Sequence, residues 1–270
     1  METEKVKCNL CGADDFRILH ALGDEGDIVK CRKCELVYRN PRPAQKEIDK
    51  WYEQDFHLTE YKTLYGVEYT QDKESISKIA QQRMEVMNSL TKPGRILDVG
   101  CAAGFFLDVA RRQGWEPYGV EISPYIARFA REEMKLNVFV GELHQAKFAD
   151  NFFTATAIWY VLEHTQNPSA ILKEMARVTK PGGIVAVSCP NIGGTYYRFC
   201  TKEWLKEQPS LHHFYDFSAR TLGQMMEKTG LKVEKVTYGG KIFSNGKFTL
   251  RSKWEWLPWG NTMALYARKV

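Results

Sequence analysis

Two acidic residues and two glycines define the most informative part of the chain, which runs from Arg95 to Glu121. A short apolar run ends at Asp98, and Gly100 and Gly104 follow it in a turn that opens an amphipathic helix. Glycines at such a turn let a ligand approach the backbone without meeting a Cβ atom. A second strand then ends at Glu121, where a carboxylate can accept hydrogen bonds from both hydroxyls of a ribose. The segment therefore predicts a site for a ligand that contains a nucleoside.

The spacing of the glycines narrows the choice of ligand. A dinucleotide-binding turn needs the pattern G-x-G-x-x-G, which the turn from Gly100 to Gly104 lacks. The turn resembles the first motif of class I S-adenosylmethionine (SAM) methyltransferases, D/E-x-G-x-G-x-G, with Ala102 in place of the middle glycine. The alternative is a glycine turn in an α/β domain that binds no ligand. The resemblance implies that SAM is the cofactor and that it is bound by Asp98, Gly100, Cys101, Ala102, Gly104, Phe105, Glu121, Ile122, Glu142 and Trp159.

Four cysteines near the N-terminus form two C-x2-C pairs, Cys8 with Cys11 and Cys31 with Cys34. This spacing is typical of sites in which four thiolates surround Zn²⁺ at about 2.3 Å. A piece of about 40 residues buries too little core to fold alone, so a metal ion would be needed to stabilise it. Two disulfides or a redox dithiol are the alternatives. We therefore predict a zinc ribbon over residues 1–42, with these four cysteines as ligands.

A helical linker or lid is expected next, over residues 43–92. The two prolines of Asn40–Pro43 predict a break in regular structure before it. The helical pattern is interrupted at the tyrosine-rich piece Tyr61–Tyr69, whose tyrosines are spaced four apart and would share one helix face. They would either form a lid or bury themselves. The helix expected over Asp72–Leu90 has apolar residues at helical spacing, which are Ile76, Ile79, Ala80, Met84, Met87 and Leu90.

Residues 93–270 alternate between strand and helix patterns, which predicts an α/β fold with a mostly parallel sheet. Ser123 is the expected N-cap of a helix over residues 123–134, and Lys180–Gly183 is the expected turn after a helix over residues 168–179. Further strands are expected at residues 138–140, 153–160, 184–188, 232–237 and 262–268, and a further helix at 219–229. The resemblance to class I methyltransferases implies a Rossmann-like seven-stranded sheet that ends in a β-hairpin, with residues 192–217 inserted on the acceptor side.

Two histidines are the candidate general bases. The segment WYVLEH, from Trp159 to His164, resembles the one after the fourth strand of ubiquinone-type and sugar methyltransferases. The stretch KEWLKEQPSLHHFYDFSARTL resembles a pattern of the same relatives, which aligns their histidine with His213. A hydroxyl acceptor must lose a proton, and an imidazole with its pKa near neutrality can accept it. His164 could instead cap and pack the turn beside Glu163. The ring of Trp159 could attract the sulfonium of SAM, and core packing is the alternative for this residue.

Composition agrees with an enzyme that does not span a membrane. The 270 residues are 44% apolar and 13% aromatic, enough for one sizeable domain and a small module. No signal peptide or membrane-spanning run is evident, so we expect a cytoplasmic protein. From Ile192 to Val270, 13 Lys and Arg oppose 6 Asp and Glu. This basic end suits an anionic partner such as a nucleotide-sugar or RNA, or is simply solvated surface.

We therefore expect a SAM-dependent methyltransferase that acts on a small polar acceptor, preferably a sugar hydroxyl in a carbohydrate or nucleotide-sugar. One alternative is an RNA methyltransferase whose ribbon binds nucleic acid, and another is a SAM-binding docking module without catalysis. The Asn/Asp-Pro-Pro-Tyr/Phe segment of many amino-methylating enzymes is missing after Trp159, which counts against the first. The intact pair of Asp98 and Glu121 counts against the second. Oxygen, nitrogen or carbon attack and the oligomeric state stay open.

Overall fold

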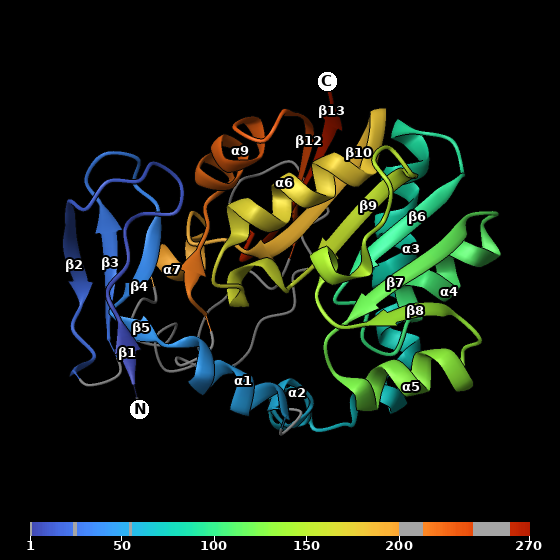
Figure 1. Ribbon diagram of the computed structural model, residues 1–270, viewed down its shortest axis with the longest axis horizontal. Helices are drawn as coiled ribbons and strands as arrows, with labels where there is room; N and C mark the ends of the chain where they lie inside the picture. The colour runs from blue at the N-terminus through green and yellow to red at the C-terminus, as the bar shows by residue number, and fades with distance from the viewer. Residues whose placement is uncertain (1, 24–25, 54–55, 200–212, 240–259) are drawn as a thin grey trace. The chain divides into compact units, whose positions relative to one another are not determined.

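The computed structural model describes residues 2–23, 26–53, 56–199, 213–239 and 260–270 (Figure 1). The chain folds as two compact units. The first, called here the ribbon unit, consists of Met1–Ala44, Tyr160–Leu172 and Val187–Ala267. The second, called the glycine-turn unit, consists of Gln45–Trp159, Lys173–Ala186 and Arg268–Val270. Among the described helices, none has both the length and the apolar character needed to cross a bilayer.

A seven-stranded sheet forms the α/β part of the fold. Its strand order is β12–β13–β10–β9–β6–β7–β8 (Figure 1). β6 pairs in parallel with β7 and with β9, and β7 pairs in parallel with β8. The seven-stranded sheet is the predicted one, and β13 lies between β12 and β10, as the closing hairpin requires. The strands are β6 (Arg95–Val99), β7 (Glu116–Glu121), β8 (Asn137–Val140), β9 (Phe153–Trp159), β10 (Thr179–Pro190), β12 (Leu231–Gly239) and β13 (Thr262–Lys269).

Helices cover the strands of the glycine-turn unit. α4 (Phe105–Arg112) packs against α3 (Lys73–Leu90) and β7, and α5 (Pro124–Glu132) packs against β7 and β8. Strand β9 is apolar because it is covered, and its Ala155, Ala157 and Ile158 are fully buried. The predicted N-cap of α5 is confirmed, since the side chain of Ser123 accepts a hydrogen bond from the amide of Ile126.

The segment before the sheet is helical, as predicted. It contains α1 (Gln45–Glu53), α2 (Phe56–Tyr65), a 3₁₀ turn (Tyr69–Gln71) and α3. The helical segment is interrupted within the predicted piece Tyr61–Tyr69, because α2 ends at Tyr65, before Gly66, which has a φ of +72°. Ile79 is 47% exposed, because the buried stripe of α3 runs through Ala80, Met84 and Met87.

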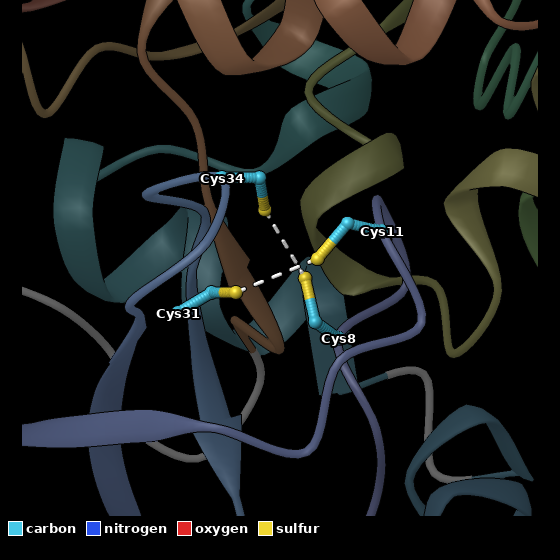
Figure 2. Close-up of side chains that lie close together, drawn as sticks. All are labelled: Cys8, Cys11, Cys31 and Cys34. Atoms are coloured by element: carbon cyan, nitrogen blue, oxygen red, sulfur yellow. Dashed lines mark hydrogen bonds between the residues drawn. The ribbon is translucent and has the colours of Figure 1, made fainter.

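Three N-terminal strands and one strand from later in the chain form a four-stranded sheet in the order β11–β4–β3–β2. They are β2 (Phe16–His20), β3 (Asp27–Cys31), β4 (Val37–Asn40) and β11 (Tyr215–Asp216). All pairings are antiparallel, and the edge strand β11 comes from the connection after β10, which the sequence did not predict. The four cysteines meet at the turns of this ribbon (Figure 2).

The predicted break at Asn40–Pro43 is wrong in its extent. β4 continues to Asn40, and β5 (Arg42–Pro43) pairs with β1 (Thr3–Glu4). Proline is tolerated in such a short edge pairing because no hydrogen bond from its nitrogen is required. The predicted turn Lys180–Gly183 is also part of a strand, since β10 begins at Thr179, directly after α6 (Pro168–Val178). Gly182, with a φ of +74°, lies within this strand.

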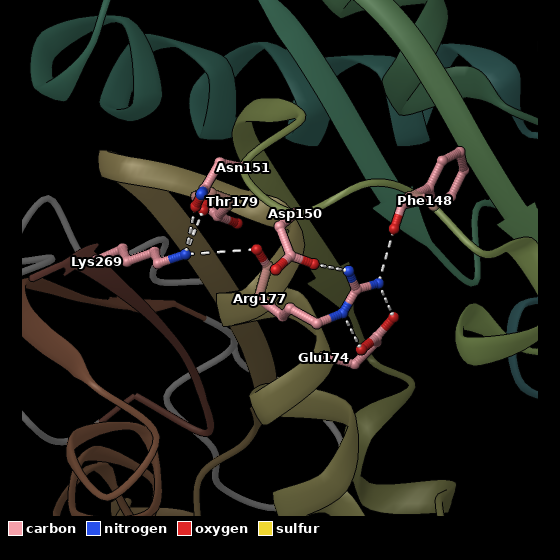
Figure 3. A network of polar contacts seen from close by, with 7 residues as sticks. All are labelled: Phe148, Asp150, Asn151, Glu174, Arg177, Thr179 and Lys269. Atoms are coloured by element: carbon pink, nitrogen blue, oxygen red, sulfur yellow. Dashed lines mark hydrogen bonds and ion pairs between the residues drawn. The ribbon is translucent and has the colours of Figure 1, made fainter.

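A polar network ties the last strand to the start of β10 (Figure 3). Lys269 donates from Nζ to the carbonyl of Thr179 at 2.8 Å and to Oδ1 of Asn151 at 2.7 Å. Arg177 pairs with Glu174 at 2.6 Å and also with Asp150. These contacts fix the C-terminal strand to the loop before β9. The remaining described helices are α7 (Thr195–Phe199) and α9 (Ala219–Glu227), of which α9 packs on β12.

Candidate functional site

The turn after β6 has the backbone conformation that its glycines predict. Gly100 and Gly104 have φ angles of +74° and +79°, in the left-handed region. A Cβ atom on Gly104 would lie 2.3 Å from Cδ1 of Leu136, so a larger residue there would have to displace the Leu136 side chain as well as adopt a left-handed φ. Ala102 also has a positive φ, of +46°, a conformation that costs an alanine about 1 to 2 kcal/mol. The turn therefore keeps the geometry of a glycine-rich loop even where alanine replaces glycine.

Glu121 lies at the tip of β7 and is held in place by backbone amides. Its Oε2 accepts a hydrogen bond from the amide of Ala102 at 2.9 Å, and its Oε1 accepts one from the amide of Ser123 at 2.9 Å. A carboxylate has about four acceptor sites, so each oxygen keeps capacity for a further donor. The side chain is thus fixed beside the turn while it can still accept hydrogen bonds from two hydroxyls.

Asp98 supplies a second, more deeply buried carboxyl group. Burial raises its pKa well above the ordinary value; the charge of Arg83 opposes this shift and Glu121 adds to it. Its Oδ1 is buried and has no hydrogen-bond partner among the described residues. A buried acceptor without a partner would be stabilised by a hydrogen bond from a donor on a bound ligand. The orphaned oxygen, the glycine turn and the fixed Glu121 together fit SAM as the cofactor.

Arg83 is a member of this group that the sequence reasoning missed. Its guanidinium lies 4.3 Å from the ring centroid of Trp159, at the end of β9. A signal for it exists, because Arg83 follows Ala80 by three residues and precedes Met87 by four, on the buried stripe of α3. The arginine thus brings a positive charge to Asp98 and to an aromatic ring at once.

Aromatic rings line up beside the glycine turn. Tyr69 stacks on Phe105, with centroids 6.0 Å apart and planes 3° apart, and burial is the main cause that raises its pKa. Tyr61 lies 4.5 Å from Tyr65 and 4.8 Å from Tyr69 between ring centroids. Neither of the two interpretations holds for all three tyrosines, because Tyr61 and Tyr69 are partly buried whereas Tyr65 is 64% exposed.

The other predicted cofactor residues have different environments. Cys101 is buried, and Trp159 packs edge-on against Phe106, with centroids 5.1 Å apart. Ile122 is partly exposed beside Glu121. Glu142 caps a 3₁₀ turn (Leu143–Ala146), and its carboxylate is exposed, 3.1 Å from His144. These contacts are those of a helix cap, so nothing in them joins Glu142 to Asp98 or Glu121.

The four N-terminal cysteines form one cluster (Figure 2). Their sulfur atoms all lie within 4.8 Å of one another, with Cys8 and Cys34 at 3.4 Å and Cys11 and Cys31 at 3.5 Å. No disulfide bond joins any two of these four cysteines in the structure. Burial is the main cause that raises the pKa of Cys8, and it raises that of Cys34 to about 11. Thiolates here would need a cation beside them, and four such sulfurs are the donor set that Zn²⁺ prefers.

The two candidate histidines come together in the ribbon unit. His164 ends a 3₁₀ turn (Leu162–His164) after β9, and His213 lies just before β11. Their ring centroids are 4.6 Å apart, with the planes at 79°. Ligand atoms of Glu163, His164 and His213 all lie within 4.8 Å of one another. The amide of Phe214 donates to the carbonyl of Glu163 at 2.8 Å and so joins the two segments.

Two buried carboxyl groups accompany these histidines. Glu163 is 1% exposed, and neither of its carboxyl oxygens has a hydrogen-bond partner among the described residues. Burial raises the pKa of Glu163 to about 8, and Asp216 contributes to the rise. Burial also raises the pKa of Asp216 to about 7, against the opposing charge of Arg39. The group can take up and hold a proton near neutral pH, and a carboxylate with two imidazoles is also a donor set for divalent cations.

Comparison with known proteins gives a consistent result. A family model described as "Methyltransferase domain" matches residues 70–236. A ubiquinone biosynthesis O-methyltransferase of Xanthomonas axonopodis pv. citri is 27% identical over 200 residues, which cover 69% of this chain and 77% of that protein. One of Alkalilimnicola ehrlichii is 33% identical over 111 residues, which cover 39% of this chain and only 45% of that protein.

Solved structures share the fold. A SAM-dependent methyltransferase of Archaeoglobus fulgidus superposes with a TM-score of 0.59 at 18% identity, covering 79% of this chain and 99% of its own. Magnesium protoporphyrin IX methyltransferase of Synechocystis PCC 6803, solved with bound S-adenosylhomocysteine (SAH), superposes with a TM-score of 0.58 at 16% identity. That match covers 84% of this chain and all of the other. At these identities the likeness concerns the architecture.

Proposed function

Because the chain belongs to the methyltransferase-domain family and is a class I SAM-dependent methyltransferase, we propose that it methylates a hydroxyl group of a small polar acceptor. The names of the sequence relatives support attack by oxygen, since they are O-methyltransferases. The preferred acceptor class is a sugar or nucleotide-sugar hydroxyl. The observation that carries the proposal is the contact of His164 with His213 beside the buried Glu163.

The glycine-turn unit would bind the cofactor. Glu121 would accept hydrogen bonds from the ribose hydroxyls of SAM with the acceptor capacity that its two amide bonds leave free. The turn with left-handed residues at Gly100, Ala102 and Gly104 would present its backbone to the ligand. Asp98 and Arg83 would bind the charged end of the cofactor, and the ring of Trp159 would face the sulfonium. Phe105, Cys101 and Ile122 would complete the surroundings, and the role of Glu142 stays a prediction.

The histidine pair would handle the acceptor proton. In the proposed step the acceptor oxygen attacks the methyl carbon in line with the carbon–sulfur bond, and that bond breaks to leave neutral SAH. The hydroxyl proton passes to Nδ1 or Nε2 of His213 or His164, which serves as general base. The ligand atoms of the buried Glu163 lie within 4.8 Å of those of both histidines, so this carboxyl group, once ionised, would stabilise the imidazolium that results. General-base catalysis of this kind contributes typically about 10² to 10⁴ in rate.

The cysteine cluster would hold one zinc ion with Cys8, Cys11, Cys31 and Cys34. Four thiolates close the coordination sphere of a tetrahedral ion, so the zinc would stabilise the ribbon and would not itself contact the reacting groups. RNA as the acceptor stays a weaker alternative, because the described ribbon shows both acidic and basic side chains in pairs such as Lys30 with Glu35. Residues 200–212 of the expected acceptor-side insertion lie outside the described residues.

Isotope transfer tests the proposal without knowledge of the acceptor. The enzyme is incubated with SAM that carries a trideuteromethyl group and with a panel of monosaccharides, nucleotide-sugars, catechols and short RNAs. Mass spectrometry should find the labelled methyl group on an oxygen of one small-molecule class, and the His213→Asn variant should slow its appearance. Label on RNA alone, or on nitrogen or carbon, would contradict hydroxyl methylation. Binding of SAM without transfer to any panel member would favour the docking module.

A further inference from the structure

We infer that the cysteine ribbon positions the two histidines, so that the metal state of the four cysteines controls the acceptor side of the reaction. This inference rests on the proposed function for its catalytic consequence. Its structural part stands on hydrogen bonds within the ribbon unit alone. Each cysteine pair is connected to one of the two segments that carry a histidine.

The second cysteine pair is connected to His213 through strand pairing. The turn from Cys31 to Cys34 leads directly into β4, and the amide of Cys31 donates to the carbonyl of Leu36 at 2.9 Å. β4 pairs with β11, with Tyr38 opposite Tyr215 and Val37 opposite Asp216. The edge strand β11 has no other strand partner in the described sheet, so its place depends on β4.

Phe214, the residue after His213, is held from both sides. Its carbonyl accepts a hydrogen bond from the amide of Arg39 in β4 at 3.0 Å. Its own amide donates to the carbonyl of Glu163 at 2.8 Å. The backbone at His213 is thus fixed between the ribbon and the turn that carries His164.

The first cysteine pair is connected to the loop after His164. Asn9 lies between Cys8 and Cys11, and its Oδ1 accepts a hydrogen bond from the amide of Ser169 at 3.0 Å. Its Nδ2 donates to Oδ1 of Asn167 at 3.0 Å. A side chain inside the first knuckle therefore holds the start of α6, a few residues beyond His164.

Arg42, which follows β4, joins the same two segments. Its Nη1 donates to the carbonyl of Gln166 at 2.6 Å and to the hydroxyl of Tyr215 at 3.1 Å. The hydroxyl of Tyr215 in turn donates to the carbonyl of Gln166 at 3.0 Å. The ribbon also supplies charge, because the positive charge of Arg39 opposes the rise that burial causes in the pKa of Asp216.

A metal ion at the cysteines would therefore act through these bonds. Without it, the two knuckles lose the constraint that fixes their turns, and Asn9 and β4 lose their fixed positions. A displacement of about 1 Å at a reacting group can cost about 10² in rate. The glycine-turn unit contains no residue of this network, so cofactor binding should not follow the metal.

The test compares Cys34→Ser with Lys33→Ser, a change of an exposed neighbour in the same turn. Hydrogen exchange followed by mass spectrometry should show faster exchange at residues 213–217 and 163–169 in Cys34→Ser, with no change at 96–109. SAH affinity by calorimetry should be unchanged. Lys33→Ser should behave as wild type, and adding Zn²⁺ to chelator-treated wild-type protein should restore slow exchange. Unchanged exchange at 213–217 after metal loss would overturn the inference.

A second variant covers the case in which Cys34→Ser does not fold. Asn9→Ala leaves the four sulfurs in place and should retain the zinc content and SAH affinity of the wild type. It should speed exchange at 163–169 and lower kcat toward the acceptor found by isotope transfer by up to about 10². A wild-type rate and wild-type exchange in Asn9→Ala would overturn the inference. If no hydroxyl acceptor is found, the proposed function fails, while the exchange measurements still decide whether the ribbon positions these segments.

Discussion

His164 and His213 lie with their ring centroids 4.6 Å apart, although they come from segments far apart in the sequence. Two separate sequence motifs each indicated one histidine as a candidate general base. Their contact beside Glu163 turns two alternatives into one group, in which one imidazole can accept a proton while the other side chains stabilise the charge. Either histidine can therefore take the proton, and the two variants must be compared.

Replacing the general base should slow methyl transfer and leave cofactor binding intact. We expect His213→Asn or His164→Asn to lose about 10² to 10⁴ in kcat, while SAH affinity by calorimetry hardly changes. Because an imidazole must be neutral to accept a proton, the wild-type rate should rise with pH through about 6 to 8. His144→Asn, a change of an exposed histidine, is the control. Normal turnover in both variants would eliminate the general-base role.

Glu163 should make stability depend on pH. The folded protein keeps its carboxyl group protonated up to a pKa of about 8, whereas an ordinary glutamate titrates near 4.3. The folded state therefore binds more protons in this window, so the free energy of unfolding falls as pH rises from about 5 to 8. The side chain of the Glu163→Gln variant cannot ionise. Its free energy of unfolding should therefore fall by at least about 1 kcal/mol less than that of the wild type across this pH window.

Urea unfolding at several pH values measures this difference. The two proteins should be nearest in stability at the acidic end and furthest apart at the alkaline end. The wild-type slope also contains Asp216, whose pKa of about 7 acts in the same direction. Parallel curves for wild type and Glu163→Gln would show that the carboxyl group is already ionised in the folded protein.

The cysteine cluster should contain one zinc ion per chain. Elemental analysis of purified protein should find one equivalent, and Cys31→Ser should lose it. Because metal binding stabilises so small a ribbon, that variant should become sensitive to protease before Asn40, while SAM binding persists. Cys189→Ser, a change of a buried cysteine outside the cluster, should keep the metal. A second equivalent that disappears in His213→Asn would assign a cation to the histidine pair and would contradict its role as a base.

The network at Lys269 should contribute to stability and not to function. Lys269→Met removes hydrogen bonds to Asn151 and to the carbonyl of Thr179, and we expect it to lower the free energy of unfolding by about 1 to 3 kcal/mol. Lys235→Met, a change of an exposed lysine on β12, is the matched control and should change stability by less than about 0.5 kcal/mol. Equal stability of the two variants would show that the network adds nothing.

Local signals predicted much of the fold, and non-local contacts account for most of what they missed. The glycine turn, the N-cap at Ser123 and the buried strand β9 depend on residues close in sequence, and each forms where it was expected. The two-residue strand β11 is too short for any hydrophobic period, so its pairing with β4 had no sequence signal. The structure also brings His164 and His213 into contact, which the motif around each histidine did not predict.

The same reason applies to the candidate sites. The four cysteines were predictable because their spacing alone specifies a donor set. Arg83 was missed because a charged residue on a helix is usually solvated, and only the strand opposite reveals that it meets Trp159. Asp216 was missed because its burial depends on the ribbon.

Calorimetric titration of the cofactor is the most direct test of the central claim. SAM or SAH should bind the wild-type protein with micromolar affinity, and NAD should give no heat. Glu121→Ala should weaken binding by about 1 to 3 kcal/mol, because the ribose hydroxyls lose their acceptor. Glu116→Ala, a change of an exposed acid at the start of the same strand, should bind as wild type. Binding of NAD in place of SAM, or unchanged affinity in Glu121→Ala, would contradict the assignment of this turn as the SAM site.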